Sequence, residues 1–186
     1  MKMTGRRRAG QGPRVGGPFA APATQSVRVA QQQGHVVFVW GNPLAGASTA
    51  LQILHEASRT RTALIDGTQP GWQEEVQQAV DEGAIALVDG TLNSPEDVQQ
   101  LFDSGFVSAA GGIIVRLWTS DEEALRRADA TERALTQDQL LTFRKKVAGI
   151  QARINLLSMP NSMIPNEFGS LDMAIGELAR RGGVTS

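Results

Sequence analysis

Cysteine is absent from this chain of 186 residues, and histidine occurs only twice, as His35 and His55. The lack of cysteine excludes disulfides, thiol chemistry and cysteine-based metal sites, and two histidines argue against a histidine-rich metal centre. No apolar run approaches the roughly 18 residues that cross a membrane, and the basic N-terminus lacks the apolar core of a signal peptide. We therefore expect no metal site, no membrane contact, and a cytoplasmic or particle-enclosed location.

The residues that are present indicate a globular protein with an uneven distribution of charge. Hydrophobic residues make up 41% and charged residues 20% of the sequence, which is typical of a soluble domain with a full core. Residues 1–34 contain six bases and no acid, and the rest contains 12 bases and 19 acids, so the net charge of −1 hides +6 against −7. We predict a basic arm over residues 1–34 and a folded domain over residues 35–186.

The predicted arm is rich in Gly, Pro, Ala and Gln and cannot bury enough apolar surface to fold alone. It is either a solvated tail or a segment that lies on a partner. That partner would be another protein subunit or a copy of this chain, or a nucleic-acid backbone, because arginines followed by glycines suit phosphate contacts without sequence readout. The residues expected to make these contacts are Arg6, Arg7, Arg8, Arg14 and Phe19.

From residue 35 onward, short apolar runs alternate with amphipathic segments. The run "HVVFVW" at 35–40 is typical of a strand buried on both faces. Further strands are predicted at 62–66, 84–89, 112–118 and 154–159, with helices between them. Ser94 and the pair Thr136 and Gln139 have the spacing of helix caps. This order predicts an α/β fold of three layers, with one parallel five-stranded sheet and its first strand at the centre.

The segment "GNPLAGAST" directly after the first strand has the outline of a phosphate-binding loop. Gly41, four further residues, Gly46 and Ser48 match the pattern G-x-x-x-x-G-K-[ST], but Ala47 stands where that pattern has lysine. Ligands of parallel α/β folds bind at the carboxyl ends of the strands, where this loop should lie. The chain is therefore either a nucleotide-binding protein without its lysine or a related fold with another use.

The loop, together with "ALVDGTLNSPEDVQQLFDSG" and "GIIVRLWTSDEEALRRA", resembles the nucleoside monophosphate kinases, and adenylate kinases in particular. The resemblance spans roughly residues 35–181 and implies a P-loop kinase fold. In that family the loop lysine reaches the β- and γ-phosphates and the hydroxyl after it holds magnesium. The residues that the resemblance implies for binding ATP and magnesium are Gly41, Gly46, Ser48, Thr49 and Asp89.

This sequence departs from the family where phosphate is held. Ala47 removes the loop cation, and Thr91 begins a segment without the arginine that follows the third strand in the family. We therefore expect no catalytic residue, no phosphoryl transfer, and at most weak binding of ATP with magnesium. Arg126, Arg127 or Arg133 could replace the lysine, since they stand near the position of the family's lid arginines. They also lie among five acids between residues 121 and 132, which favours a solvated, salt-bridged helix face.

The other candidates also have purely structural interpretations. Gly41 and Gly46 could serve only the tight turn from strand to helix. Asp66 and Asp89, each followed by glycine at the end of a strand, could cap turns. Trp72 opens a predicted helix and could face solvent or a partner.

Two functions remain open on the sequence. In the first, the chain is a non-catalytic structural or assembly protein, whose degenerate kinase-like domain docks in a larger complex through the basic arm. A bacteriophage virion is one setting for such a protein. In the second, the chain is a nucleotide-binding protein, or a (deoxy)nucleoside monophosphate kinase that uses arginines in place of the loop lysine.

Overall fold

The computed structural model describes residues 34–107, 111–132, 134–167 and 169–185. The contacts predicted for Arg6, Arg7, Arg8, Arg14 and Phe19 lie outside the described residues. The described part of the chain belongs to one compact unit, Gln31–Ser186. No helix in these described ranges has the length and apolar character needed to cross a bilayer.

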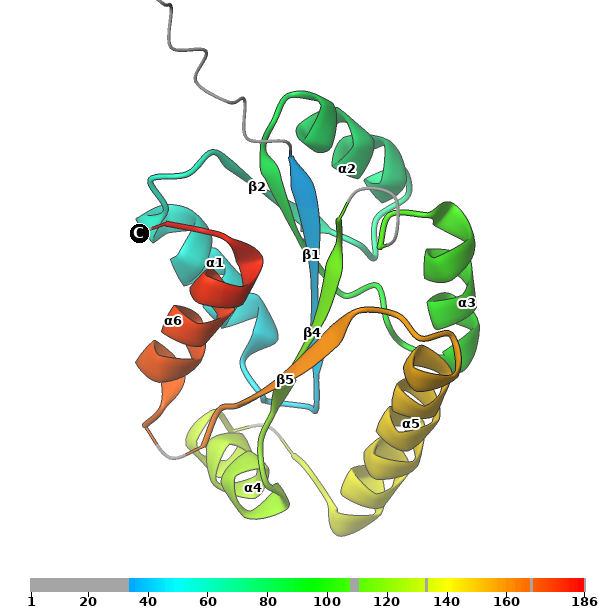
Figure 1. Cartoon of the computed structure of the whole chain (residues 1–186). Coiled ribbons are helices and arrows are strands. Elements are labelled where there is room, and N and C mark those ends of the chain that lie inside the picture. The colour runs from blue at the N-terminus through cyan, green and yellow to red at the C-terminus, as the bar shows by residue number, and fades with distance from the viewer. Residues whose placement is uncertain (1–33, 108–110, 133, 168, 186) are drawn as a thin grey trace, which may run out of the picture. The chain divides into compact units, whose positions relative to one another are not determined.

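Five strands form one parallel sheet. They are β1 (His35–Gly41), β2 (Thr62–Asp66), β3 (Ile85–Asp89), β4 (Ile113–Trp118) and β5 (Asn161–Pro165). Their order across the sheet is β2-β3-β1-β4-β5, and each neighbouring pair is parallel. β1 is the central strand (Figure 1), which confirms the predicted α/β fold and the place of its first strand.

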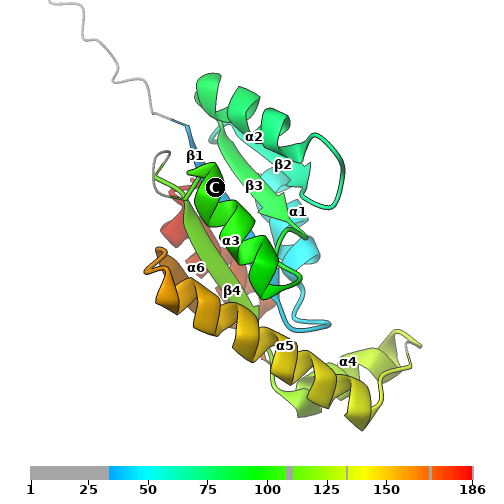
Figure 2. The same ribbon diagram turned by 90° about the vertical axis from the view of Figure 1, so that its right-hand side faces the viewer.

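Helices cover both faces of this sheet. Those in the described residues are α1 (Ala47–Ala57), α2 (Trp72–Asp81), α3 (Pro95–Ser104), α4 (Asp121–Ala130), α5 (Gln137–Leu156) and α6 (Leu171–Gly182). α2, α3 and α5 pack on one face, and α1 and α6 pack on the other (Figures 1 and 2). α4 follows β4 directly, so it stands at the carboxyl edge of the sheet, beside the loop after β1.

The core is built on β1. Val36, Val37, Phe38 and Val39 are all 0% exposed, because helices close both faces of this strand. Successive side chains of a strand point to opposite faces. Val36 and Phe38 accordingly join the core under α2, α3 and α5, whereas Val37 and Val39 join the core under α1 and α6.

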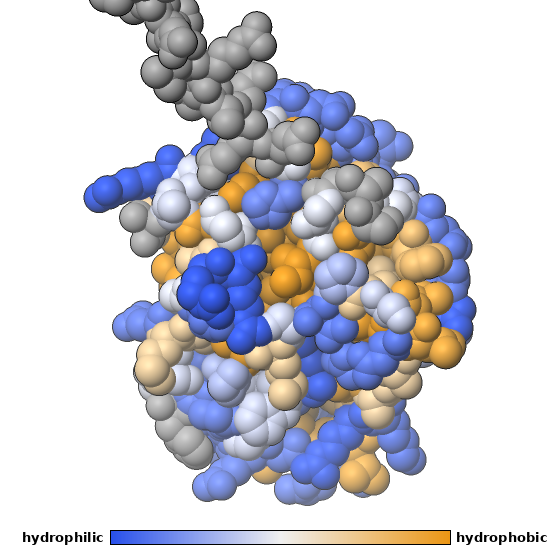
Figure 3. All heavy atoms as spheres, viewed as in Figure 1, coloured by the Kyte–Doolittle hydropathy of each residue, from blue (hydrophilic) through white to orange (hydrophobic). Residues whose placement is uncertain are grey.

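The predicted fifth strand at 154–159 is wrong. Ile154 and Leu156 belong to the last turn of α5, and the strand follows later, as β5. The apolar run has helical periodicity, since Ile150 and Ile154 are buried against the sheet while Leu156 is 72% exposed. β5 reads "NSMIP" and buries only Ile164, so it gives almost no apolar signal of its own. Figure 3 views the molecule from the same side as Figure 1 and shows hydrophobic residues exposed among hydrophilic ones on this face.

The predicted helix caps are confirmed. The Ser94 hydroxyl accepts a hydrogen bond from the backbone N–H of Asp97 at 3.2 Å. At the start of α5, the Thr136 hydroxyl accepts from the N–H of Gln139, and the Gln139 side chain accepts from the N–H of Thr136. These reciprocal bonds satisfy two amide donors that a helix start otherwise leaves without partners.

Trp72, for which a solvent or partner contact was left open, is partly buried and packs against the core. Its ring meets Phe38 edge-on with 6.0 Å between centroids, and it lies 6.1 Å from Phe106. Phe102 on α3 is 43% exposed.

The end of α5 gives a stability test with a matched control. Ile154→Ala should lower the free energy of unfolding by about 2–5 kcal/mol, because Ile154 is completely buried. Leu156→Ala should change it by less than about 0.5 kcal/mol, since that side chain is mostly in water. Chemical denaturation measures both. Equal losses would contradict the helix, because residues two apart share one face of a strand.

Candidate functional site

The loop between β1 and α1 turns sharply at the carboxyl edge of the sheet. Its first turn is closed by the N–H of Ala45, which donates to the carbonyl oxygen of Asn42 at 3.0 Å. Leu44 and Gly46 both have left-handed backbone conformations, with φ of 61° and 81°. α1 begins immediately after Gly46, and no side chain caps its first amides.

Both loop glycines have steric reasons to be glycine. A Cβ at Gly41 would lie 2.5 Å from the carbonyl oxygen of Leu117 on β4, which is closer than atoms can approach. Gly46 needs a positive φ, and a Cβ there would lie 3.1 Å from the side-chain nitrogen of Asn166. The fold itself therefore requires these two glycines, and their presence alone does not indicate a bound phosphate.

All five residues that the resemblance implied for nucleotide binding line one cavity beside this loop. They are Gly41, Gly46, Ser48, Thr49 and Asp89. The cavity has a volume of about 740 Å³ and also takes in Arg126 and Arg127 of α4 and Asn166 from the segment after β5. The structure thus brings the predicted residues together, and it adds a second wall formed by α4 and the segment after β5.

The two Asp-Gly positions have different roles. Asp66 accepts bonds from the hydroxyl and N–H of Thr68 and from the side chain of Gln69, and the Thr68 hydroxyl is the main reason that the pKa of Asp66 is lowered. Its turn-capping interpretation is therefore correct. Asp89 instead accepts a hydrogen bond from the Ser48 hydroxyl and faces the loop cavity. Of these two aspartates, only Asp89 remains a candidate for ligand binding.

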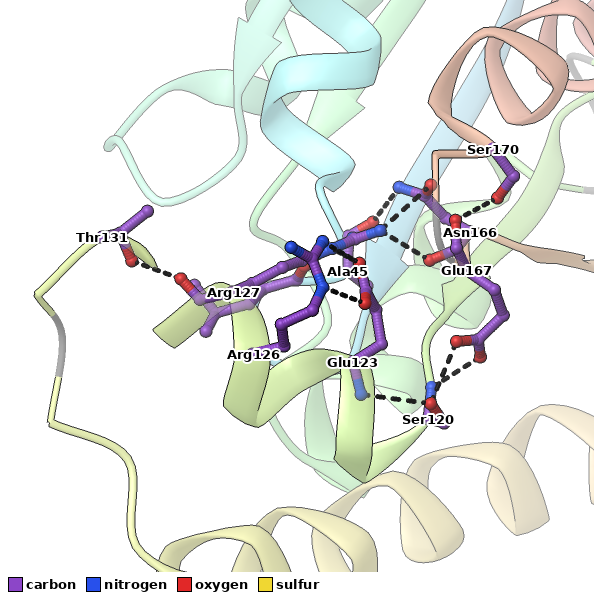
Figure 4. A network of polar contacts seen from close by, with 10 residues as sticks. Ala45, Ser120, Glu123, Arg126, Arg127, Thr131, Asn166, Glu167 and Ser170 are labelled. Carbon is purple, nitrogen blue, oxygen red and sulfur yellow. Dashed lines mark hydrogen bonds and ion pairs between the residues drawn. The ribbon is translucent and has the colours of Figure 1, made fainter. Parts of the chain in front are cut away.

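α4 contributes a buried carboxylate to the cavity wall. Glu123 is 0% exposed, and it accepts bonds from Arg126 Nε at 2.6 Å and from Arg127 Nε at 2.7 Å (Figure 4). Because α4 places residues three and four apart on the same side, one glutamate can hold both arginines. The solvated helix face expected from the sequence is therefore wrong for Glu123 and Arg127, whose side chain is only 20% exposed. Arg133, the third candidate, lies outside the described residues.

Arg127 also holds the loop directly. Its Nη1 donates to the carbonyl oxygen of Leu44 at 2.9 Å, and its Nη2 donates to the carbonyl oxygen of Asn166 at 2.9 Å. Asn166 in turn donates from its side chain to the carbonyl oxygen of Ala45 at 2.8 Å. Each guanidinium nitrogen of Arg127 thus has a protein acceptor, and two successive loop carbonyls are fixed by α4 and the segment after β5 (Figure 4).

The start of α4 is anchored to that same segment. Glu167 accepts bonds from the N–H of Ser120 at 2.6 Å and from its hydroxyl at 2.9 Å. The Ser120 hydroxyl also caps α4 by accepting from the N–H of Glu123. These bonds hold Glu123 in place on a helix that contributes little to the main core.

The charge of Glu123 is stabilised by its partners. Hydrogen bonding from Arg126 is the largest effect, burial opposes it, and Arg127 adds to it, so the pKa of Glu123 falls from 4.5 to about 2. The same contacts raise the pKa of Arg126. At neutral pH, this side of the cavity is therefore an ionised network in which one carboxylate pairs with two arginines.

Sequence reasoning missed two residues of this site, Glu123 and Asn166. The spacing of Glu123 to Arg126 and Arg127 is visible in the sequence, but nothing there indicates that the carboxylate is buried. Asn166 follows β5, so misplacing the fifth strand hid it. A hydrophilic strand at the sheet edge leaves no pattern that would have located this residue.

Comparison with known proteins gives the fold. No family model and no curated protein matches this chain. Among solved structures, the tunicamycin resistance protein of Deinococcus radiodurans has a TM-score of 0.51 at 13% identity, over 82% of this chain and 97% of that one. A gluconokinase from Sinorhizobium meliloti has a TM-score of 0.50 at 14% identity, over 82% and 95%. The domain has a P-loop kinase-like fold, as the sequence predicted.

Glu123 should couple stability to pH. Its pKa in the folded protein, about 2, lies below the ordinary value of 4.5. The ionised carboxylate therefore contributes its full stabilisation above pH 4.5, and this contribution is lost as the pH falls from 4.5 towards 2. Glu123→Gln should lower the melting temperature at pH 7 and flatten its decline in that acid window. Thermal melts from pH 7 to pH 2 measure both effects.

Glu177 of α6 gives a matched control. It also precedes its two arginines by three and four residues, and hydrogen bonding from Arg180 and then Arg181 lowers its pKa to about 2. Its side chain is 31% exposed, so water compensates for a lost partner. Glu177→Gln should therefore lower the melting temperature less than Glu123→Gln. Equal or reversed effects would show that the Glu123 network does not support the loop.

Proposed function

We propose that this chain is a non-catalytic protein with a P-loop kinase-like domain, which serves as a docking component of a larger assembly. The non-catalytic part of the proposal rests on the hydrogen bonds that hold the guanidinium of Arg127 within the protein. This arginine lines the loop cavity and is a candidate to replace the missing lysine, yet its Nε, Nη1 and Nη2 are bonded to Glu123, Leu44 and Asn166. A cation held in this way stabilises the loop and does not follow a phosphate through a reaction.

The residue that stands at the place of the loop lysine supports the same conclusion. Ala47 is the first residue of α1 and lines the cavity, so a methyl group stands where the resemblance implies a mobile ammonium. Phosphoryl transfer depends on cations that neutralise the charge developing on the phosphate oxygens. Removing one preorganised group of that kind typically costs several kcal/mol of transition-state stabilisation.

The remaining charges of the cavity offer little compensation. Among its described lining residues, Asp89 and Glu123 carry two negative charges, and Arg126 and Arg127 carry two positive ones. Both arginines are ion-paired with Glu123. A nucleoside triphosphate with its several negative charges would therefore enter a site that is formally neutral.

ATP with magnesium fits these residues only in part. Ser48 and Asp89 present the hydroxyl and carboxylate oxygens that Mg²⁺ accepts, and the uncapped start of α1 offers amide donors for an anion. The triphosphate itself finds no side chain to replace the lysine among the described lining residues. We infer weak binding at this loop, without turnover.

The docking part of the proposal rests on charge. Between Arg61 and Arg116 the chain has no lysine or arginine, and it carries nine acids. These are Asp66, Glu74, Glu75, Asp81, Glu82, Asp89, Glu96, Asp97 and Asp103. Most belong to α2 and α3, so this side of the domain suits a basic partner. Residues 1–34 of another copy, with six bases and no acid, have the complementary charge, and a bacteriophage virion stays a prediction for the assembly.

Calorimetry tests the nucleotide site. For the full chain with ATP or dATP and magnesium, we expect dissociation constants in the millimolar range, equivalent to about −4 kcal/mol or weaker, and no turnover. Ala47→Lys should tighten binding about tenfold, because it restores a cation worth about 1.4 kcal/mol. Gln52→Lys adds the same charge to α1 at an exposed position outside the cavity and should have no effect. Micromolar affinity or measurable turnover of the natural chain would favour a kinase.

A truncation tests the docking part. Removing residues 1–30 should leave the circular dichroism spectrum and melting temperature of the domain unchanged, because the Gly-, Pro- and Gln-rich sequence of this segment offers little apolar surface to a core. Association of the full chain in sedimentation experiments should disappear in the truncated chain and weaken with salt, since exposed charges are screened beyond about 8–10 Å at physiological ionic strength. A truncated chain that unfolds, or that associates as well as the full chain, would refute the proposed role of the arm.

A further inference from the structure

A second cavity lies on the other side of the loop, between the end of β4 and α5. Its volume is about 640 Å³, which is within the range of about 300–1,000 Å³ found for small-molecule sites. It shares only Asn42 with the loop cavity among the described residues. Its polar wall includes Arg116, Thr119 and Asp121, and its opposite wall includes Val147 and other residues of α5.

Arg116 is the unusual group in this cavity. It lies on β4 within the sheet, and its Nη2 donates to the side-chain oxygen of Asn42 at 3.1 Å. The guanidinium lies 5.5 Å from the centre of the Trp40 ring, and Nε is buried without an acceptor. In the described ranges no carboxylate forms an ion pair with it, although a half-buried cation normally has one. Burial lowers the pKa of Arg116, which agrees with a cation that lacks its counter-ion.

A second polar group of the cavity wall also lacks a partner. Thr119 is 1% exposed, lines the cavity, and has a hydroxyl with no hydrogen bond in the described part of the chain. Buried hydroxyls are nearly always bonded, so Thr119 is a second polar group of this wall whose hydrogen-bonding capacity is unused in the described part of the chain. The carbonyl oxygen of Thr119 accepts from the side chain of Asn42 at 3.2 Å, so Asn42 connects Thr119 to Arg116.

The charge of the cavity selects the ligand. Arg144 is ion-paired with Asp121, so Arg116 leaves the lining residues with one net positive charge. Asp121 repels a dianion such as hydrogen phosphate more strongly than a monoanion, and a carboxylate matches both the single net charge and the planar fork of a guanidinium. The α5 wall presents Val147, Ala148 and Ala152, which suit an apolar body behind the carboxylate.

We propose that this cavity binds a small organic monocarboxylate, with its carboxylate on Arg116 and its apolar part against α5. This site does not depend on nucleotide binding at the loop. Because Asn42 belongs to the loop and bonds Arg116, the ligand competes with the loop for the same guanidinium. The bound carboxylate also supplies the counter-ion that Arg116 lacks within the protein.

The test uses the full chain and the probes sodium benzoate, benzyl alcohol and inorganic phosphate. Benzoate should shift the NMR signals of the Thr119 amide and the Trp118 indole saturably in the millimolar range, which is typical of so small a ligand. Benzyl alcohol and phosphate should bind at least about tenfold more weakly, because the first lacks the charge and the second carries too much. A glutamate-containing tripeptide serves as a probe for a protein carboxylate.

Variants locate the site. Arg116→Gln should weaken benzoate binding at least about tenfold through loss of a charge-assisted bond pair. Ala152→Glu places a competing carboxylate on the exposed surface of α5 without disturbing the core, and it should abolish binding even if Arg116→Gln fails to fold. Arg153→Gln, on the same helix but outside this cavity, should bind like the natural chain.

Several results would overturn the proposal. These are the absence of saturable benzoate binding, binding that survives Ala152→Glu, and phosphate binding tighter than benzoate. A tripeptide that binds more tightly than benzoate would replace the small-molecule assignment by a protein carboxylate. Loss of nucleotide binding at the loop would leave the expected benzoate result unchanged, so the two sites are tested separately.

Discussion

The arrangement around the loop depends on the buried carboxylate of Glu123. A fully buried charge is stable only when it is paired and hydrogen-bonded, so Glu123 requires Arg126 and Arg127 beside it. Arg127 then reaches the carbonyl oxygen of Leu44, a non-glycine residue with a positive φ, and also holds Asn166, which bonds the next loop carbonyl. The loop shape is thus maintained from outside by three residues that come from α4 and the segment after β5.

This arrangement explains how a kinase-like loop can persist without its lysine. In the proposed function, a fixed guanidinium outside the loop replaces a mobile ammonium within it, and the network that preserves the loop also engages the guanidinium that a phosphate would need. The fold does not depend on which cation holds the loop. The central strand β1 is buried by both helical layers, and the close approach of β4 requires a glycine at Gly41. Fold and activity can therefore separate, as they do in many widely used folds.

The sequence predicted the parts of the domain that carry strong local signals. β1 to β4 are apolar runs between glycines and caps, and the Ser94 and Thr136 caps have recognisable spacing, so these elements were placed correctly. β5 is a hydrophilic edge strand, and its neighbour α5 ends in an apolar run, so periodicity over a few residues favoured the wrong segment. Ser48 and Asp89 could be placed at the loop cavity because they lie in motifs. Glu123 and Asn166 were missed because their importance comes from burial and long-range contacts, which a local pattern does not contain.

In the proposed function, Arg127 serves as a structural cation of the loop. The most direct measurement is the side-chain Nε–H resonance of Arg127 in the full chain, followed by NMR for exchange with water and during titration with magnesium and ATP. The account predicts slow exchange, because Nε is bonded to the buried Glu123 at 2.7 Å, and an unchanged resonance even where the amides of Gly46 and Ala47 respond to nucleotide. An Arg127 Nε–H that exchanges as fast as that of an exposed arginine, or that shifts together with the loop amides, would contradict it.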